Sequence, residues 1–299
     1  IYENDEIWGQ FIEDSTGYLS LPIGLQFTEG NSYYIEITAN NQVYRTLPQV
    51  VQPRLNTDTM SFNLDVRTIG TSSDGRPIEE ALIDVFVHVD VPQDLESPLY
   101  YRWQVDEVWA FNEVDKPAFQ LDSGEIDIIN TCYLSASVQE NVSTLLNSND
   151  VGAGEAILRV ASRPIDESFL QRHVYSAYLH ALDKRAYDYY ERSRRLGQID
   201  GSLYDELPAA VRGNVFNANT DSELVLGYVE ISTTDTFRLN ILRDQIDYNW
   251  YDQCRPPEDA EADCNFPPQP PGDTSTVYCK CYDCWRIYGR GTLERPFWW

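Results

Sequence analysis

The sequence predicts a mainly β protein. We expect a truncated N-terminal Ig-like β-sandwich, then a larger β-rich domain with one main helix and a disulfide-tied C-terminal tail. Three observations support this fold class. Apolar and polar residues alternate along several segments, as they do in half-buried strands. Only one stretch has helical spacing. Five of the six cysteines fall in the last fifth of the 299-residue chain.

The N-terminal segment reads as a few short strands. Residues 33–39 alternate in polarity, and Asn40-Asn41 separates them from a second strand-like run at 42–46. Asparagine tolerates positive φ, so this pair predicts a tight hairpin. An Ig-like sandwich needs about seven strands, and only a few fit before Pro48. We therefore expect residues 1–52 to be the C-terminal part of an Ig-like domain whose first strands are missing.

A proline-bounded stretch at residues 48–58 predicts a linker, followed by a β-rich domain over residues 53–299. Alternation continues through this second part. It predicts strands at 84–91, 100–111, 124–129, 156–160, 224–231 and 237–241.

One segment, residues 183–196, has the pattern of a helix. Asp183 can cap its N-terminus, and Gly197 suits the left-handed stop position. Its apolar face carries Ala186, Tyr187 and Tyr190. Three arginines crowd the last turn, where the helix dipole favours cations, and we expect them to form a solvated helix end: Arg192, Arg194 and Arg195.

The cysteine pattern predicts disulfides in an exported protein, because an even number of cysteines clusters around a proline-rich, acidic tail at residues 252–299. The candidates are Cys132, Cys254, Cys264, Cys279, Cys281 and Cys284. A zinc site is the competing interpretation. It would use Cys279, Cys281 and Cys284, with Cys254 or Cys264 as fourth ligand, but the spacing differs from paired Cys-x-x-Cys motifs.

The charge balance excludes some classes of partner. The chain has 48 acidic and 22 basic residues and a formal net charge of −26. Such a surface repels phosphate backbones, so we expect no nucleic-acid partner. The chain also has 20 Tyr and 7 Trp, more than a core needs, and these residue types are common on recognition surfaces.

Catalytic motifs are weak or broken. Residues 124–130 resemble the active-site strand of laminarinase-type glycoside hydrolases, with Glu125 and Asp127 on one face, but Asn130 stands where that pattern ends in Glu. The histidines His88, His173 and His180 form no zinc motif, and His88 reads as structural. We therefore predict a non-enzymatic protein with no catalytic residue, cofactor or metal.

Several motifs occur in an order that resembles a known family. They are the segment 100–109, Asn130-Thr-Cys132-Tyr, Ala186-Tyr-Asp-Tyr-Tyr, Gly213-Asn214-Val-Phe-Asn217, Leu226-Gly227-Tyr228-Val, Cys281-Tyr-Asp-Cys284, the pair Gly289 and Gly291, and Pro296-Phe297-Trp298. Over roughly residues 15–299 the chain resembles an uncharacterised family of Bacteroidota outer-membrane lipoproteins. This domain-of-unknown-function family is commonly encoded beside SusC-type TonB-dependent transporters.

The resemblance implies a location on the cell-surface side of the outer membrane, with a lipid anchor at a missing N-terminal cysteine. It implies an accessory or ligand-binding partner of a SusC-type β-barrel transporter. A structural subunit of an outer-membrane export, assembly or gliding-motility complex is one alternative, and a surface glycoside hydrolase is another. The family has no established catalytic residues to carry over.

Two further predictions concern modification and the end of the chain. Exported Bacteroidota proteins are often O-glycosylated at Asp-Ser/Thr sites, which makes Thr59, at the edge of the predicted linker, and Ser15 candidates. Exposed aromatic side chains at a chain end are costly. We therefore expect Phe297, Trp298 and Trp299 to be buried, against the chain's own β-domain or in a partner.

Overall fold

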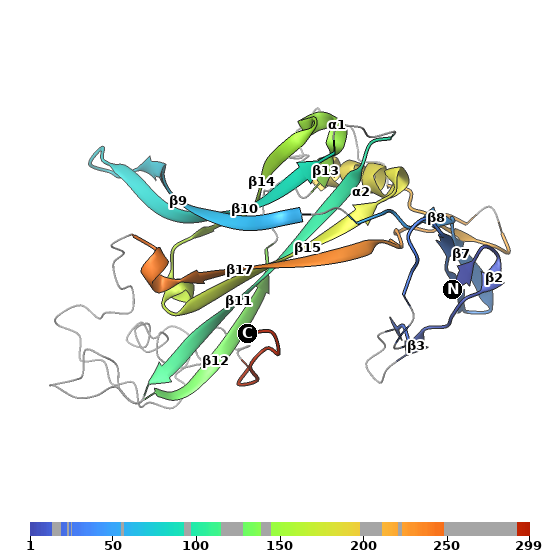
Figure 1. Cartoon of the computed structure of the whole chain (residues 1–299), viewed down its shortest axis with the longest axis horizontal. Helices are drawn as coiled ribbons and strands as arrows, with labels where there is room; N and C mark the ends of the chain where they lie inside the picture. Colours follow the sequence, from blue (N-terminus) through green and yellow to red (C-terminus); the bar gives the residue numbers. More distant parts are fainter. Residues whose placement is uncertain are drawn as a thin grey trace.

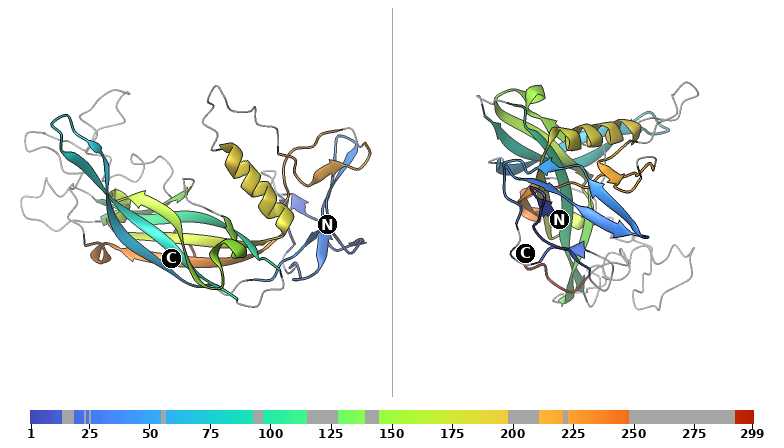
Figure 2. Two further views of the ribbon diagram at one scale, coloured as in Figure 1. Left: turned by 90° about the horizontal axis from the view of Figure 1, so that it is seen from above. Right: turned by 90° about the vertical axis from the view of Figure 1, so that its right-hand side faces the viewer.

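The computed structural model describes residues 1–13, 19–22, 24, 26–54, 57–92, 97–114, 128–138, 145–197, 211–220, 223–247 and 292–299. Within these ranges the protein is mainly β, as the alternating sequence predicts, and all strand pairs are antiparallel. The molecule is elongated. A small unit that contains the N-terminus lies at one end of a group of long strands (Figures 1 and 2).

The small N-terminal unit is built from short strands in three sheets. The first has the order β2-β1-β5-β8, the second β16-β7-β6, and the third pairs β3 with β4. The strands are β1 (Tyr2–Glu3), β2 (Glu6–Ile7), β3 (Ile12–Glu13), β4 (Leu19–Ser20), β5 (Ser32–Tyr34), β6 (Glu36–Ala39), β7 (Gln42–Thr46), β8 (Gln49–Val50) and β16 (Val215–Asn217).

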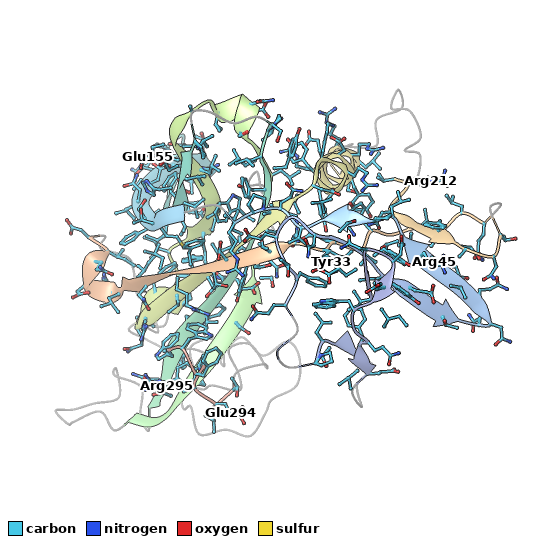
Figure 3. All side chains as sticks on the ribbon, turned by 45° about the vertical axis from the view of Figure 1, so that its right-hand side comes forward. Tyr33, Arg45, Glu155, Arg212, Glu294 and Arg295 are labelled. Atoms are coloured by element: carbon cyan, nitrogen blue, oxygen red, sulfur yellow. The ribbon has the colours of Figure 1, made fainter. Side chains whose placement is uncertain are left out.

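An aromatic core holds this unit together. Tyr33 is fully buried, and it meets Trp8 and Phe27 edge-on at ring-centroid distances of 5.4 and 4.9 Å. Figure 3 shows Tyr33 in this unit, with Arg45 on the neighbouring β7. Ile231, far away in sequence, belongs to the same core, so a later part of the chain completes the small unit.

The predicted hairpin is confirmed. Asn40 and Asn41 join β6 to β7 and have φ values of 51° and 60°. Positive φ at both central residues is what a type I′ hairpin turn requires. The predicted strand at 33–39 is interrupted at Ile35. There the chain passes from one sheet to the other, and Ile35 exchanges hydrogen bonds with Thr46.

The long strands form two sheets. One has the order β14-β10-β9, and the other β12-β11-β15-β17, with β13 paired to the start of β11. Their bounds are β9 (Thr57–Thr71), β10 (Pro77–Val91), β11 (Tyr100–Val114), β12 (Ile128–Ser137), β13 (Leu145–Asn147), β14 (Gly154–Pro164), β15 (Arg172–Leu182) and β17 (Thr233–Leu242).

The main hydrophobic core lies between these sheets. On β11, Tyr101, Trp103 and Val105 point into it, and Trp103 is 1% exposed. Ile83 and Val85 of β10 face them, each fully buried. Burying one such side chain contributes roughly 1.5–3 kcal/mol, so this inner row fixes the register of each strand.

The predicted helix is confirmed as α2 (Lys184–Gly197). The Asp183 side chain accepts a hydrogen bond from the Ala186 amide at 2.7 Å and so caps the first turn. Ala186 is buried, and the Tyr187 ring lies 4.9 Å from that of Tyr100 on β11.

The shorter helical segments are α1 (Ser148–Val151) and the 3₁₀ turns η2 (Glu167–Phe169) and η3 (Arg243–Gln245). No helix in the described part of the chain is long and apolar enough to cross a membrane.

The predicted strand at 224–231 is wrong. This segment is extended but forms only one isolated bridge, between Leu226 and Arg212. Gly227 breaks the run with a φ of +104°. Side chains then take the place of a partner strand. Asn214 bonds both the N–H and the C=O of Val229, and Gln49 bonds the same carbonyl and the Ile231 amide.

The predicted linker at 48–58 is shorter in the structure, because β8 and β9 extend into it. The proposed boundary near residue 52 stays a prediction. β16 adds to β7 of the small unit, so residues from beyond that boundary take part in the N-terminal sheets. Of the predicted strand at 124–129, only Ile128 and Ile129 are described, at the start of β12.

Candidate functional site

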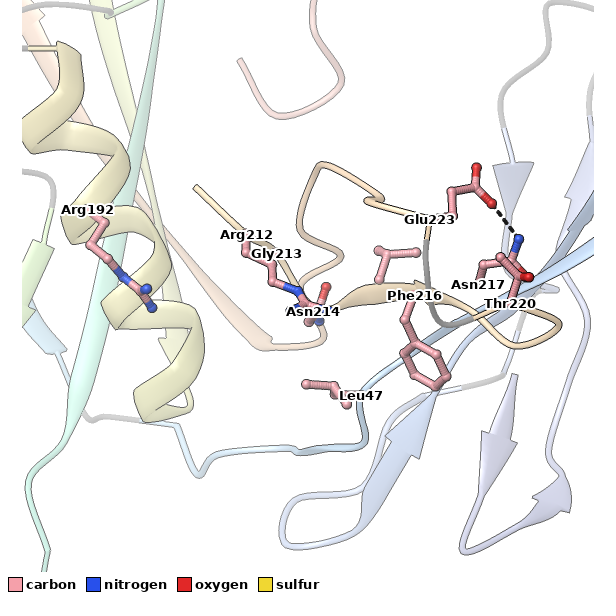
Figure 4. A pocket seen from close by; sticks show the side chains of 10 residues that line it. Leu47, Arg192, Arg212, Gly213, Asn214, Phe216, Asn217, Thr220 and Glu223 are labelled. Atoms are coloured by element: carbon pink, nitrogen blue, oxygen red, sulfur yellow. Dashed lines mark hydrogen bonds between the residues drawn. The ribbon is translucent and has the colours of Figure 1, made fainter. Parts of the chain in front are cut away.

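An open cleft lies where α2 approaches the small N-terminal unit. It has a volume of about 550 Å³. One side is α2, and the others are β16 with its flanking residues and the end of β7 (Figure 4). The lining residues are Leu47, Arg192, Arg212, Gly213, Asn214, Val215, Phe216, Asn217, Thr220 and Glu223. We call this the α2 cleft.

Two arginines face the α2 cleft from different elements. Arg192 extends from α2, while Arg212 precedes β16 (Figure 4). In the described part of the chain, neither guanidinium forms an ion pair with a carboxylate; Arg192 bonds only the Asp188 carbonyl, at 3.0 Å. The other two arginines at the end of α2 both pair with Glu191. In a chain with 48 acidic residues, two arginines without carboxylate partners in one cleft favour binding of a ligand that carries acceptor oxygens.

Hydrogen bonds hold Glu223 and Asn217 of the cleft in place. Glu223 accepts a hydrogen bond from Asn217 (Figure 4). It accepts a second, at 3.4 Å, from the Tyr44 hydroxyl. Asn217 also receives the Asn219 amide at 2.7 Å. Phe216 is 37% exposed and supplies an apolar surface. The cleft therefore offers cationic, amide and aromatic groups together, as recognition sites for small molecules do.

A half-buried ionic network joins α2 to the long strands. Arg102 and His180 are opposite each other on β11 and β15. Both contact Glu230, with distances of 3.1 Å from each nitrogen to a carboxylate oxygen. The Ser232 hydroxyl donates to the same carboxylate at 2.6 Å. The Arg102 guanidinium also lies 4.7 Å above the Tyr190 ring of α2.

The charge state of Glu230 follows from these contacts. Burial alone would raise the pKa of this carboxyl. The His180 hydrogen bond, the Arg102 charge and the Ser232 hydroxyl outweigh burial and lower the pKa to about 2. Glu230 is therefore ionised at neutral pH and ties three elements together.

A second polar network lies between the two long sheets. Glu107 of β11 is 5% exposed and contacts Arg163 of β14, which also bonds Asp166 at 3.0 Å. The His173 ring of β15 is fully buried, with Nε2 3.2 Å from Glu107. It stacks on Phe169 at a centroid distance of 4.3 Å. Burial lowers the pKa of His173, against the opposing effect of Glu107.

The structure places the predicted disulfide and metal residues as follows. Cys132 is buried on β12, at 1% exposure. Cys254, Cys264, Cys279, Cys281 and Cys284 lie outside the described residues, so their pairing stays a prediction. No group of three or more potential metal ligands occurs among the residues that the structure describes. Glu125 and Asp127 also lie outside them, and Asn130 is on β12 opposite Glu113.

Thr59, one of the two predicted glycosylation sites, does not lie in a linker. It is within β9, paired with His88 of β10, and it is exposed. The strand begins at Thr57, and Met60, Phe62 and Leu64 of it pack against the main core. Ser15 lies outside the described residues. The His88 ring bonds Ser61 at 2.8 Å and Glu155 at 2.9 Å.

The aromatic tail differs partly from its prediction. Trp299 lies 4.6 Å from the Arg172 guanidinium and Trp298 lies 4.7 Å from that of Arg238, and both rings are half-buried on the chain's own sheet. Phe297 is 96% exposed, so its predicted burial within this chain is wrong. The arginines hold the two indole faces, and the turn Pro296–Trp299 directs Phe297 away from the sheet.

Sequence reasoning did not single out Arg212 of the α2 cleft or the central residues of the two networks. Glu107 was detectable, because it interrupts the inward row Trp103, Val105, Trp109, Phe111 of an alternating strand. His173 likewise occupies an inward position of β15. Arg212 and Glu230 had no such signal, since their roles depend on contacts between distant segments.

Comparison with known families finds one family model that matches most of the chain. The family model described as "Domain of unknown function (DUF4249)" matches residues 1–238. The chain belongs to this family. The DUF4249 match includes the whole α2 cleft and both polar networks, whereas the tail 292–299 lies beyond it. No curated protein and no solved structure matches the chain.

Proposed function

We propose that this DUF4249 protein is a non-enzymatic, cell-surface outer-membrane lipoprotein that binds a ligand in the α2 cleft as the accessory partner of a SusC-type TonB-dependent transporter. The observation that carries the binding role is that Arg192 and Arg212 both line one open cleft of about 550 Å³. The motif resemblance supports the lipid anchor and the barrel partner.

The described cavities favour binding over glycoside hydrolysis. A retaining or inverting glycosidase needs two carboxyl groups across the scissile bond. Among the described lining residues, the α2 cleft has one carboxylate, Glu223, and the cavity beside β14 has one, Glu107. Glu223 is held by Asn217 and Tyr44, and Glu107 by Arg163 and His173. Each carboxylate is thus bound by cationic or polar groups of the protein itself.

The alternative role, a structural subunit of an outer-membrane export, assembly or gliding-motility complex, has one observation in its favour. Phe297 is 96% exposed beside two indole rings that rest on the sheet. A fully exposed aromatic side chain on a folded surface is typical of a protein contact.

Native purification of the tagged full-length protein, with mass spectrometry, tests these roles. We expect a TonB-dependent barrel in the wild-type eluate and a small molecule released on denaturation. The double variant Arg192→Ser, Arg212→Ser should retain the barrel and lose the small molecule. Arg76→Ser is the matched control, since this arginine lies on the exposed turn after β9, paired with Asp74. Recovery of motility or export subunits without a transporter would replace this proposal by the alternative.

A further inference from the structure

The charged side chains of the α2 cleft lie apart from one another along it. Arg192 extends from α2 on one side, Arg212 lies in the middle, and Glu223 lies on the other side beside Asn217 (Figure 4). All three charged side chains are exposed, so a ligand can reach them. None of the three forms an ion pair within the described part of the chain. The cleft therefore presents positive charge at one end and negative charge at the other.

Glu223 can accept further hydrogen bonds. A carboxylate has about four acceptor sites, and Asn217 and the Tyr44 hydroxyl use two of them. Neither of these partners carries a positive charge. An ammonium group of a ligand would supply that charge, and hydrogen bonds between charged groups are roughly twice as strong as those between neutral ones. The Glu223 end of the cleft thus suits an amine.

The surface between the charged ends is partly apolar. Phe216 is 37% exposed and Leu47 is 40% exposed, and both line the cleft. Figure 4 shows them between Arg192 and Glu223. A ligand that covers these side chains removes their apolar surface from water, which favours binding. The middle of the ligand should therefore carry apolar groups.

The net charge of the chain limits the ligand further. A formal net charge of −26 repels a free anion at long range. A molecule with one negative and one positive end has no net charge and is not repelled in this way. A neutral sugar would leave the two guanidinium groups without a counter-charge, and a simple cation would be repelled by them. A zwitterion with an apolar middle fits all of these conditions.

We propose that the ligand of the α2 cleft is a short peptide with free ends. Its terminal carboxylate binds Arg192 and Arg212, and its terminal ammonium binds Glu223. Its apolar side chains cover Phe216 and Leu47. This inference rests on the proposed binding role of the cleft and names the class of molecule that binds there. The volume of about 550 Å³ is within the usual range for small-molecule sites, so the peptide is only a few residues long.

Isothermal titration of the purified chain with trileucine tests the proposal. We expect saturable binding to the wild type. Trileucine amide lacks the carboxylate and N-acetyltrileucine lacks the ammonium, so each should bind about tenfold more weakly than trileucine. Trialanine should also bind more weakly, because its side chains cover less apolar surface.

Variants assign each end of the peptide to its residues. In the double variant Arg192→Ser, Arg212→Ser, trileucine and its amide should bind equally weakly, while N-acetylation should still weaken binding. In Glu223→Gln the pattern should be reversed. Arg76→Ser and Glu79→Gln change exposed residues at the far end of the β9–β10 hairpin, and both controls should bind trileucine as the wild type does. Thermal unfolding checks that each variant is folded.

Several results would overturn the peptide assignment. One is absence of trileucine binding to the wild type at millimolar concentration. Another is equal affinity of the wild type for trileucine, its amide and its N-acetyl form. Trigalacturonate is the competing probe, and tighter binding of this acidic sugar than of trileucine would make the cleft an acidic-glycan site.

These results are separable from a failure of the proposed function, because the titration uses the purified chain without a transporter. If the arginine double variant loses the co-purified small molecule but trileucine does not bind, the binding role stands and the peptide assignment falls. If trileucine binds as expected but no barrel co-purifies, the peptide assignment stands and the transporter partner falls.

Discussion

Gly213 and Gly227 approach so closely that a Cβ atom on Gly213 would lie 1.6 Å from the carbonyl oxygen of Gly227. These two residues bring together the segment before β16 and the extended segment 224–231. The contact positions Asn214 beside Val229 and Tyr228 beside α2. The α2 cleft therefore depends on backbone packing that only glycine at position 213 permits.

Replacing Gly213 by Ala should destabilise the protein by at least about 2 kcal/mol, because the added methyl group can be accommodated only by moving backbone. Gly70→Ala on β9 is the control, since its Cβ would meet only the Ile78 side chain, at 4.0 Å. Urea denaturation measures both. Equal stability of the two variants would contradict the close approach.

The side chain of Asn214 substitutes for a strand partner of Val229. Asn214→Ala should cost about 1–3 kcal/mol, because it leaves the Val229 amide without an acceptor while Gln49 still holds the carbonyl. Asn219→Ala removes one exposed acceptor, that of the Val43 amide, and should cost less than about 1 kcal/mol. Amide hydrogen exchange at Val229 should accelerate only in the Asn214 variant.

Removing the charge of Glu230 should show how much the half-buried network contributes to the stability of the protein. Glu230→Gln should destabilise the protein by about 3 kcal/mol at pH 7, since it leaves Arg102 and His180 partly buried without their counter-charge. Asp188→Asn breaks only the exposed pair with Lys184 and should cost less than about 0.5 kcal/mol. Comparable losses in the two variants would argue against the network.

The same carboxyl predicts a pH dependence. The folded pKa of Glu230, about 2, is below the ordinary value of 4.5. Its stabilisation is therefore complete above pH 4.5 and is lost as the pH falls toward 2. The difference in unfolding free energy between wild type and Glu230→Gln should shrink from about 3 kcal/mol toward zero over this interval. A difference that stays constant down to pH 2 would show that the carboxyl is not ion-paired.

Two residues of the aromatic tail, Trp299 and Phe297, should contribute differently to the stability of the protein. Trp299→Ala should lower stability by about 1–2 kcal/mol, because it removes the contact with Arg172 and the edge contact with Tyr133. Phe297→Ala should change it by less than about 0.5 kcal/mol, since that ring is 96% exposed. Thermal unfolding of both variants checks this. A loss for Phe297→Ala as large as that for Trp299→Ala would contradict the described orientation.

The sequence alone determined the local features of this protein. The Asn40-Asn41 hairpin and the capped helix that begins after Asp183 were both predictable, because turn and cap conformations depend on a few adjacent residues. The inner faces of β10 and β11 were also predictable, since strand periodicity is a local pattern.

Only the tertiary structure decided where distant segments meet. The segment 224–231 has the alternation of a strand, yet it bonds to the side chains of Gln49 and Asn214 rather than to a strand. Its neighbours come from distant parts of the chain, and the local pattern does not predict which residues they are. The same holds for the α2 cleft, where Arg192 meets the segment of Arg212. A site assembled from long-range contacts leaves no spacing in the sequence, because its geometry is set by packing between elements.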